Sequence, residues 1–121
     1  MKARINNFRE QLLERTLKFS EGLIKALGRV PKNSSNNILT RQAVMSGTSI
    51  GANYREACEA ESAKDFVHKI KLCKKESRET NYWLELVIRA NPRSLKELNP
   101  LKDETIEFTK IFSSISAKFN R

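Results

Sequence analysis

The sequence predicts an all-α protein, an antiparallel up-down-up-down four-helix bundle that forms a single domain over residues 1–121. Three observations lead to this prediction: apolar residues recur at helical spacing in four segments, no segment alternates as a β-strand does, and the chain has only 4 glycines and 3 prolines. Short connections between consecutive helices favour antiparallel neighbours. With 39% hydrophobic residues, 121 residues suffice for one packed core.

The first helix is expected over residues 7–27, and it carries two apolar faces. One face would supply the core through Phe8, Leu12, Phe19, Leu23 and Leu27. The other consists of Leu13, Leu17 and Ile24. A single apolar stripe is enough to pack a helix into a monomeric bundle, so the second stripe is predicted to contact another subunit. Gly28 and Pro31 are expected to end this helix.

The second helix is expected over residues 36–60, with an N-cap from Ser34, Ser35 or Asn36. Because residues 42–54 include no charged side chain, this stretch has no face that favours water. On a helical wheel one side holds Ile38, Met45, Ser49 and Ala52, and another holds Ala43, Ile50, Tyr54 and Ala57. We therefore expect the helix to be covered by its own bundle and by a neighbouring subunit.

Small residues mark where this helix can approach its neighbours. Gly47 and Gly51 are four residues apart, a spacing that lets another helix backbone come close. With the second apolar face of the first helix, they define a predicted oligomer interface. Its residues are Leu13, Leu17, Ile24, Gly47, Ile50, Gly51 and Tyr54.

The third helix is expected to begin after Ser62, whose side chain can cap the backbone near Asp65, and to end near Ala90. Its inward residues would be Phe66, Ile70, Cys73, Ser77, Leu84 and Val87 or Ile88, with Trp83 and Leu86 off the core. Pro92 and Pro100 are expected to bracket at most one or two helical turns. A last helix over about 102–118 would pack through Phe108, Ile111, Phe112, Ile115 and Phe119.

The charge balance points to a polyanionic partner. Lys and Arg total 23 against 14 Asp and Glu, a formal net charge of +9, and such a protein attracts nucleic acid by displacing its counterions. If Phe66 is set at zero on the wheel of the third helix, a basic stripe falls at roughly 120–180°. The basic stripe consists of Lys64, Lys71, Lys75, Arg78, Tyr82 and Arg89. It is the predicted nucleic-acid-binding site, with Tyr82 able to stack on an unpaired base.

Two other interpretations of this helix remain open. Glu79 and Glu85 lie at the margins of the basic stripe, as in a solvated face whose charges are partly neutralised. Trp83 and Leu86 lie off the predicted core, which suits contact with a protein better than contact with a bare polyanion.

No catalytic residue, cofactor or metal site is predicted. His68 is the one histidine, and it lies roughly 200° from Phe66, away from the core. A ferritin-type site needs a second Glu-x-x-His pair, and Cys58, His68 and Cys73 lack the paired spacing of zinc ligands. No phosphate-binding glycine motif occurs. The acidic residues Glu56, Glu59 and Glu61 are expected to pair with Arg55 and Lys64 at the helix ends.

The compartment is expected to be the cytoplasm. The opening "MKARINNFREQ" lacks the apolar run of a secretory signal, and no stretch reaches the roughly 20 apolar residues of a membrane span. In such a reducing setting both cysteines, Cys58 and Cys73, are expected to be free thiols.

The segment from Arg41 to Leu86 resembles the four-helix-bundle family encoded in intervening sequences of bacterial 23S ribosomal RNA genes. The resemblance rests on S-I-x-A-N-x-x-E-A at 49–57 and on E-x-R-E-T-x-Y-W-L at 76–84. It implies a bacterial helical bundle that assembles as a homo-oligomer, and homopentamer rings are known in the family. A related accessory protein of diversity-generating retroelements binds nucleic acid and a reverse transcriptase. Neither group supplies a catalytic residue.

Two functional hypotheses follow. The first is a non-enzymatic, oligomeric bundle that binds RNA or other nucleic acid through its basic surface. The alternative is a protein-protein assembly or adaptor module whose oligomer binds a protein partner. In both, the chain is expected to associate with copies of itself and not with a membrane.

Overall fold

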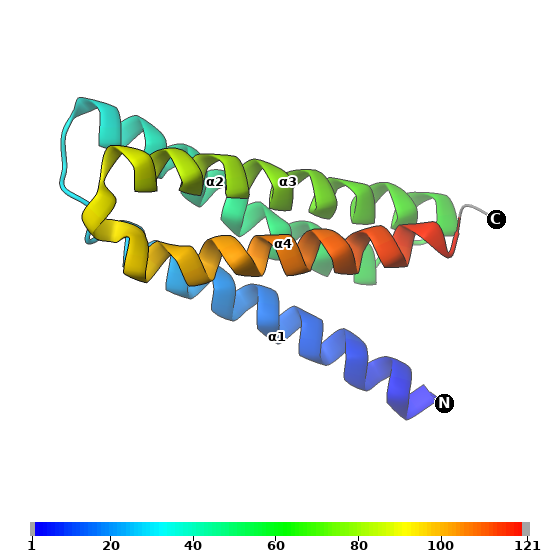
Figure 1. The fold of residues 1–121 in the computed structure, drawn as a ribbon. Helices are drawn as coiled ribbons and strands as arrows, with labels where there is room; N and C mark the ends of the chain where they lie inside the picture. The colour runs from blue at the N-terminus through cyan, green and yellow to red at the C-terminus, as the bar shows by residue number, and fades with distance from the viewer. Residues whose placement is uncertain (1, 120–121) are drawn as a thin grey trace.

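The computed structural model describes the backbone of residues 2–119 and the side chains of residues 7–119. Four α-helices and one 3₁₀ turn make up the fold: α1 Lys2–Leu27, α2 Ser34–Cys58, α3 Ala63–Ala90, η1 Pro92–Ser94 and α4 Leu95–Ala117. Successive helices run in opposite directions (Figure 1), and residues 2–119 include no strand. The predicted all-α class and four-helix bundle are confirmed.

The four helices do not contribute equally to the bundle. α3 packs against both α2 and α4, and α1 lies against α2 and α4. In Figure 1 the N-terminal half of α1 diverges from α4. The prediction that Phe8 is a core residue is therefore wrong, because this residue lies on the diverging half and is 50% exposed. The other predicted core residues of α1 are buried: Leu12, Phe19, Leu23 and Leu27.

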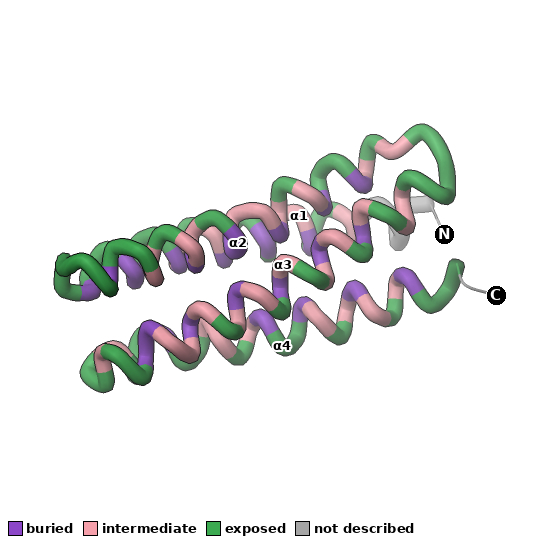
Figure 2. Tube along the Cα trace, turned by 90° about the horizontal axis from the view of Figure 1, so that it is seen from above, coloured by how far each residue is buried: buried purple, intermediate pink, exposed green. Residues whose placement is uncertain are grey.

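Buried positions recur at helical spacing along the helices (Figure 2), as periodicity predicts. The inward face of α3 is confirmed at Ile70, Cys73, Ser77, Leu84, Val87 and Ile88. Phe108 of α4 is buried and meets the Phe19 ring edge-on, with ring centroids 5.3 Å apart. The core therefore joins α1 to α4 through aromatic packing as well as aliphatic contact.

Two aromatic residues differ from expectation. Phe119 lies beyond the end of α4 and is 49% exposed, with its ring 5.3 Å from that of Phe66. Trp83 packs against the core instead of standing off it, and its Nε1 donates a hydrogen bond of 3.3 Å to Glu79. The helical wheel misplaced both because a large ring reaches sideways or past a helix end to apolar neighbours.

Polar side chains fix the ends of α2 and α3. Asn33 is the N-cap of α2, accepting the backbone N–H of Asn36 at 2.8 Å, so the predicted caps were wrong by one residue or more. Asn36 is instead buried, and its amide exchanges two 2.9 Å hydrogen bonds with Asn91 after α3. Ser62 caps α3 as predicted, accepting the N–H of Asp65 at 3.0 Å.

The helix α4 begins at Leu95, seven residues before the predicted start, and contains Pro100. A proline inside a helix removes one hydrogen bond and costs roughly 3 kcal/mol. Leu98, two residues earlier, is fully buried, and Glu97 holds Arg29 of α1 at 2.8 Å. Tertiary contacts of this first segment therefore outweigh the local cost of the proline.

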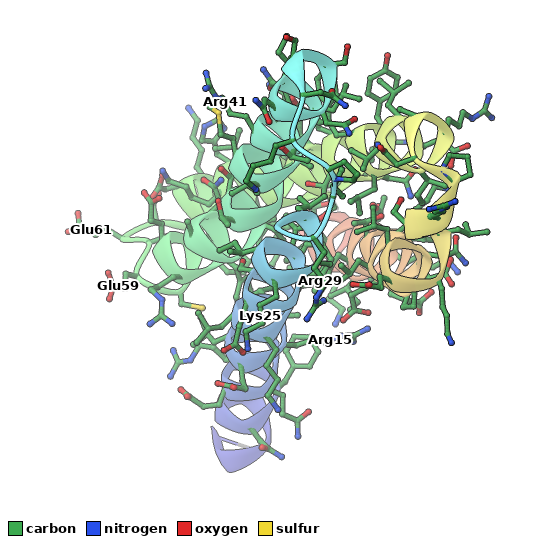
Figure 3. The ribbon with its side chains drawn as sticks, turned by 90° about the vertical axis from the view of Figure 1, so that its left-hand side faces the viewer. Arg15, Lys25, Arg29, Arg41, Glu59 and Glu61 are labelled. Carbon is green, nitrogen blue, oxygen red and sulfur yellow. The ribbon has the colours of Figure 1, made fainter. Side chains whose placement is uncertain are left out.

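Ion pairs attach α1 to α4 at two levels. Arg15 donates two hydrogen bonds of 2.7 Å to Glu104 and stands over the ring of Phe108. Arg29 donates to Glu97 near the other end of the helix pair. Figure 3 labels both arginines on the side of α1 toward α4. The bidentate geometry makes the Arg15 pair the more specific of the two.

The α1–α2 contact requires a glycine at position 47. A Cβ added to Gly47 would overlap the Leu23 side chain, which is fully buried and cannot withdraw freely. We predict that Gly47→Ala lowers the free energy of unfolding by about 1–3 kcal/mol through overpacking. Urea denaturation followed by circular dichroism measures the change.

Gly22→Ala is the matched control, because a Cβ there would lie 3.7 Å from Leu101, an ordinary contact. That variant should be neutral or up to about 1 kcal/mol more stable, since alanine favours helix over glycine. Equal stability of the two variants would contradict the close α1–α2 packing.

Candidate nucleic-acid interface

The basic stripe lies on the outside of α3. All six of its side chains are exposed: Lys64, Lys71, Lys75, Arg78, Tyr82 and Arg89. The Tyr82 ring is held edge-on against Trp83, with ring centroids 5.1 Å apart. Because Trp83 is itself packed on the core, its indole ring supports the exposed ring of Tyr82.

The stripe resolves into two parallel rows. Over seven residues an α-helix rotates by about 700°, which is 20° short of two full turns, and rises by about 10.5 Å. Residues seven apart therefore lie nearly in line. The inner row is Lys64, Lys71 and Arg78, and the outer row is Lys75, Tyr82 and Arg89, which His68, outside the stripe itself, extends by one position. Both rows run along the length of α3.

The inner row borders the groove between α3 and α4. One hollow of about 380 Å³ is lined by Ala63, Lys64, Val67, His68, Lys71 and Phe119. A second, of about 360 Å³, is lined by Arg78, Asn81, Lys102, Thr105, Ile106 and Thr109. Their α3 lining residues share one side of the helix, and the remaining lining residues belong to α4 or to Phe119 just beyond it; we call the two hollows together the α3–α4 groove.

Hydrogen bonds build the floor of the second hollow. Asn81 Nδ2 donates to Thr105 Oγ1 at 3.0 Å and lies 3.4 Å from the carbonyl oxygen of Lys102. Thr109 Oγ1 donates to the Thr105 carbonyl at 2.8 Å. These bonds make the floor of the second hollow polar but uncharged and fix the position of α4 against α3, whereas Ala63, Val67 and Phe119 line the first hollow.

Lys74 is a cation of this groove that sequence reasoning missed. It follows Val67 and precedes Asn81 by seven residues each, so it lies in line with residues that line the two hollows, and it is half-buried. On the wheel of α3 alone it falls at roughly 80°, between core and surface. Only the position of α4 shows that this angle faces a groove. In the same way, only the packing of α3 against α4 shows that Lys102 lines it.

The cations of α3 between Lys64 and Arg78, apart from Lys69, make no ion pair among the described residues, although Lys75 interacts electrostatically with the adjacent Glu76. Among residues 7–119, no carboxylate lies within ion-pair distance of five cations: Lys64, Lys71, Lys74, Lys75 and Arg78. Arg89, by contrast, pairs with Glu85 at 2.7 Å, and Lys102 pairs with the same carboxylate at 3.2 Å. Hydrogen bonds from Arg89 and Lys102 hold the pKa of Glu85 below its usual value. Within the basic stripe, the unpaired charge thus lies over residues 64–78.

The acidic residues near the α2–α3 turn do not neutralise the stripe. Glu56 pairs with Lys69 at 3.2 Å, not with Arg55 or Lys64 as expected. Glu59 and Glu61 point outward from the turn (Figure 3) and make no ion pair among the described residues.

The residues predicted at an oligomer interface separate into two groups. Four lie inside one chain: Gly47 faces Leu23, Gly51 faces Thr16, and Ile50 and Tyr54 are buried in the core. Their side chains are covered by the chain's own helices, so no second copy is needed to explain them. Leu13 is partly buried, whereas Leu17 and Ile24 are 55% and 52% exposed.

The outer face of α2 is also apolar and open. Ile38 and Met45 are exposed, and Met45 lines a hollow between α1 and α2 together with Ile24 and Val44. The expectation that α2 is covered on its second side is therefore not met within one chain. The uncharged stretch of α2 leaves an exposed α1–α2 face that includes Leu17, Ile24, Ile38 and Met45.

The thiols and the histidine are placed as expected. Both cysteines are free. Cys73 is fully buried, and burial raises the pKa of its thiol to about 12; burial also raises the pKa of the half-buried Cys58. His68 is exposed. Within the described part of the chain, no group of three or more His, Cys, Asp or Glu residues could hold a metal ion, and no described helix is both long and apolar enough to span a membrane.

The comparisons agree on one family. The family model for the 23S rRNA-intervening sequence protein matches residues 10–114. A solved structure of a protein of unknown function from the S23 ribosomal protein family, from Bacteroides thetaiotaomicron, is 33% identical to this chain, with a TM-score of 0.78. The match covers 86% of this chain and 96% of that one. No curated protein matches the chain.

The two thiols should differ sharply in reactivity. With 5,5′-dithiobis(2-nitrobenzoate) at about pH 8, Cys58 should react in the native protein and Cys73 only after unfolding, because a buried, protonated thiol is a poor nucleophile. Absorbance should report one thiol per chain before denaturant and a second after it. Cys58→Ser should abolish the native-state reaction, and a variant that still reacted rapidly would contradict the burial of Cys73.

Proposed function

The chain belongs to the family of 23S rRNA-intervening sequence proteins, and we propose that it is a non-enzymatic cytoplasmic protein that binds nucleic acid through α3. The observation that carries this proposal is the set of unpaired cations between Lys64 and Arg78. They extend over about 21 Å of helix, a length over which several phosphates of one strand can be contacted.

The arrangement of these cations is costly unless an anion binds. Lys71 and Lys75 are four residues apart, as are Lys74 and Arg78, and like charges at that spacing destabilise a helix by roughly 0.2–0.5 kcal/mol per pair. Phosphates would relieve this repulsion and release condensed counterions. An array that served only solubility would not need its charges on one side of one helix.

The absence of enzymatic activity is part of the proposal. Neither the matched family description nor that of the solved structure names a catalytic activity. His68 lies exposed on the outer row of α3 and Cys73 is enclosed in the core, so neither has the setting of an activated base or nucleophile.

Reversing three charges should abolish binding. The triple variant Lys71→Glu, Lys75→Glu, Arg78→Glu should weaken the affinity for structured RNA by more than about 100-fold at low salt, because it replaces phosphate contacts with repulsion. Filter binding at two or more salt concentrations measures the affinity. For the triple variant, log Kd should also depend less steeply on the logarithm of the salt concentration than it does for the unmodified chain.

The control variant Lys32→Glu, Arg93→Glu, Lys96→Glu makes the same change in net charge at exposed positions outside α3. It should retain most of the affinity. Equal losses in the two triple variants would show that only net charge matters, and binding insensitive to salt would refute the proposal.

Self-association is a second proposed property, and the exposed α1–α2 face supports it. Four exposed large apolar side chains lie on this one helix pair, with Lys32 and Arg41 beside Ile24 and Met45, and such a cluster of apolar side chains is typical of a protein interface. The family resemblance implies assembly into a homopentamer. The same face is also where the alternative function, an adaptor that binds a protein partner, would act.

A charge on this face should disrupt assembly. We predict that Ile24→Lys combined with Met45→Lys converts the oligomer to the 13.9 kDa monomer, because buried charges without partners oppose association. Light scattering at micromolar concentration gives the mass. Leu95→Lys, at an exposed apolar residue that starts α4, should leave the mass unchanged. A wild-type chain that is already monomeric would overturn this proposal.

A further inference from the structure

We propose that the α3–α4 groove is the binding site for one unpaired nucleic-acid strand, with its phosphates along the inner row and a base stacked on Phe119. This inference rests on the proposed function and narrows it from polyanions in general to single strands. It is carried by the joint placement of an exposed aromatic ring and three unpaired cations that line the two hollows, with a fourth, Lys74, on the same side of α3.

The cations are distributed so that a single chain can follow them. Lys64, Lys71 and Arg78 repeat every 10.5 Å or so along one wall, and Lys74 lies between the two hollows. Each hollow falls within the roughly 300–1,000 Å³ typical of small-ligand pockets. A strand lying in the groove would therefore place its phosphates near the inner row and sugars or bases over the floor.

The far wall and the ends define where the strand can lie. Lys102 of α4 faces the second hollow but is shared with Glu85, so it contributes less charge than the α3 cations. Glu107 on α4 is engaged by Lys110 at 3.4 Å. Glu85, which also holds Arg89, places a carboxylate beyond Arg78. Anion binding is therefore favoured from Lys64 to Arg78 and not farther toward the end of α3.

Phe119 gives the groove a feature that a duplex does not use. Its ring is held by Phe66 at 5.3 Å yet remains 49% exposed, beside Lys64, His68 and Lys71. An exposed aromatic ring among cations is the usual platform for an unpaired base, and such stacking contributes roughly 1–3 kcal/mol per base. Bases inside a duplex are already stacked on one another and cannot use it.

The phosphate contacts and the base contact can be separated by experiment. Fluorescence anisotropy is measured on the full chain with three labelled probes of about ten nucleotides or base pairs: oligouridine, oligodeoxythymidine and an RNA duplex. Phe119→Leu removes the ring and retains an apolar side chain. It should weaken both single strands about tenfold, or ~1.4 kcal/mol, and leave the duplex within about twofold.

Phe8→Leu is the matched control, because Phe8 is equally exposed at 50% but lies on α1. It should change no affinity, and thermal melting by circular dichroism should show that both variants are folded. Lys71→Gln with Lys74→Gln should weaken all three probes and reduce the salt dependence. The comparison of oligouridine with oligodeoxythymidine shows in addition whether the protein contacts the ribose 2′-hydroxyl, because only then does it prefer RNA.

Two results would overturn the inference, and they differ from failure of the proposed function. If the duplex binds more tightly than either single strand, or if Phe119→Leu has no effect while charge reversal still abolishes binding, the strand site is refuted and polyanion binding stands. If none of the three probes binds, the proposed function itself fails.

Discussion

The helix α3 packs against α2 on one side and α4 on the other, and Ile70, Leu84 and Val87 on its inner face have no solvent exposure. This burial fixes the rotation of α3 about its own axis. Once that rotation is fixed, residues about half a turn away must face water, and they are the cations of the two rows. The inner row then meets α4 at the edge of the helix pair. The position of the charged groove is thus a consequence of apolar packing on the opposite side of the same helix.

Cross-helix hydrogen bonds complete what apolar burial leaves undetermined, which is how far one helix slides along another. Most buried hydroxyls bond within their own helix, as Ser77 does to the carbonyl of Cys73, and such bonds set no register. Several hydrogen bonds between helices do set it, among them Ser46 with Thr80, Asn36 with Asn91, and Asn81 with Thr105. The last one places α4 so that Thr105 and Lys102 stand across from Arg78. Thr105 Oγ1 also donates to the carbonyl of Lys102 in its own helix, so what the Asn81 bond adds is the register of α4 against α3.

Periodicity alone predicted the helices and the buried face of α3 because each depends on a single helix. It failed where the burial of a residue or the start of a helix depends on a second helix or on a helix end. Phe8 has the spacing of a core residue, but α1 has already diverged from α4 there; α4 begins before Pro100 because Leu98 and Glu97 find partners on other helices. Lys74 and Lys102 were missed for the same reason. A wheel gives an angle, and only the neighbouring helix tells whether that angle faces water, core or groove.

The exposed α1–α2 face and the α3–α4 groove belong to different helix pairs, which matters for how the two proposed properties combine. In a bundle whose helices follow one another around the core, these pairs lie on opposite sides. Copies that associate through α1 and α2 would therefore leave each groove open. Several grooves on one assembly raise the effective concentration of the second and later sites for a strand long enough to reach them. A shallow groove with few contacts, weak in one chain, would then bind a long strand well, and the affinity would depend on strand length more than on sequence.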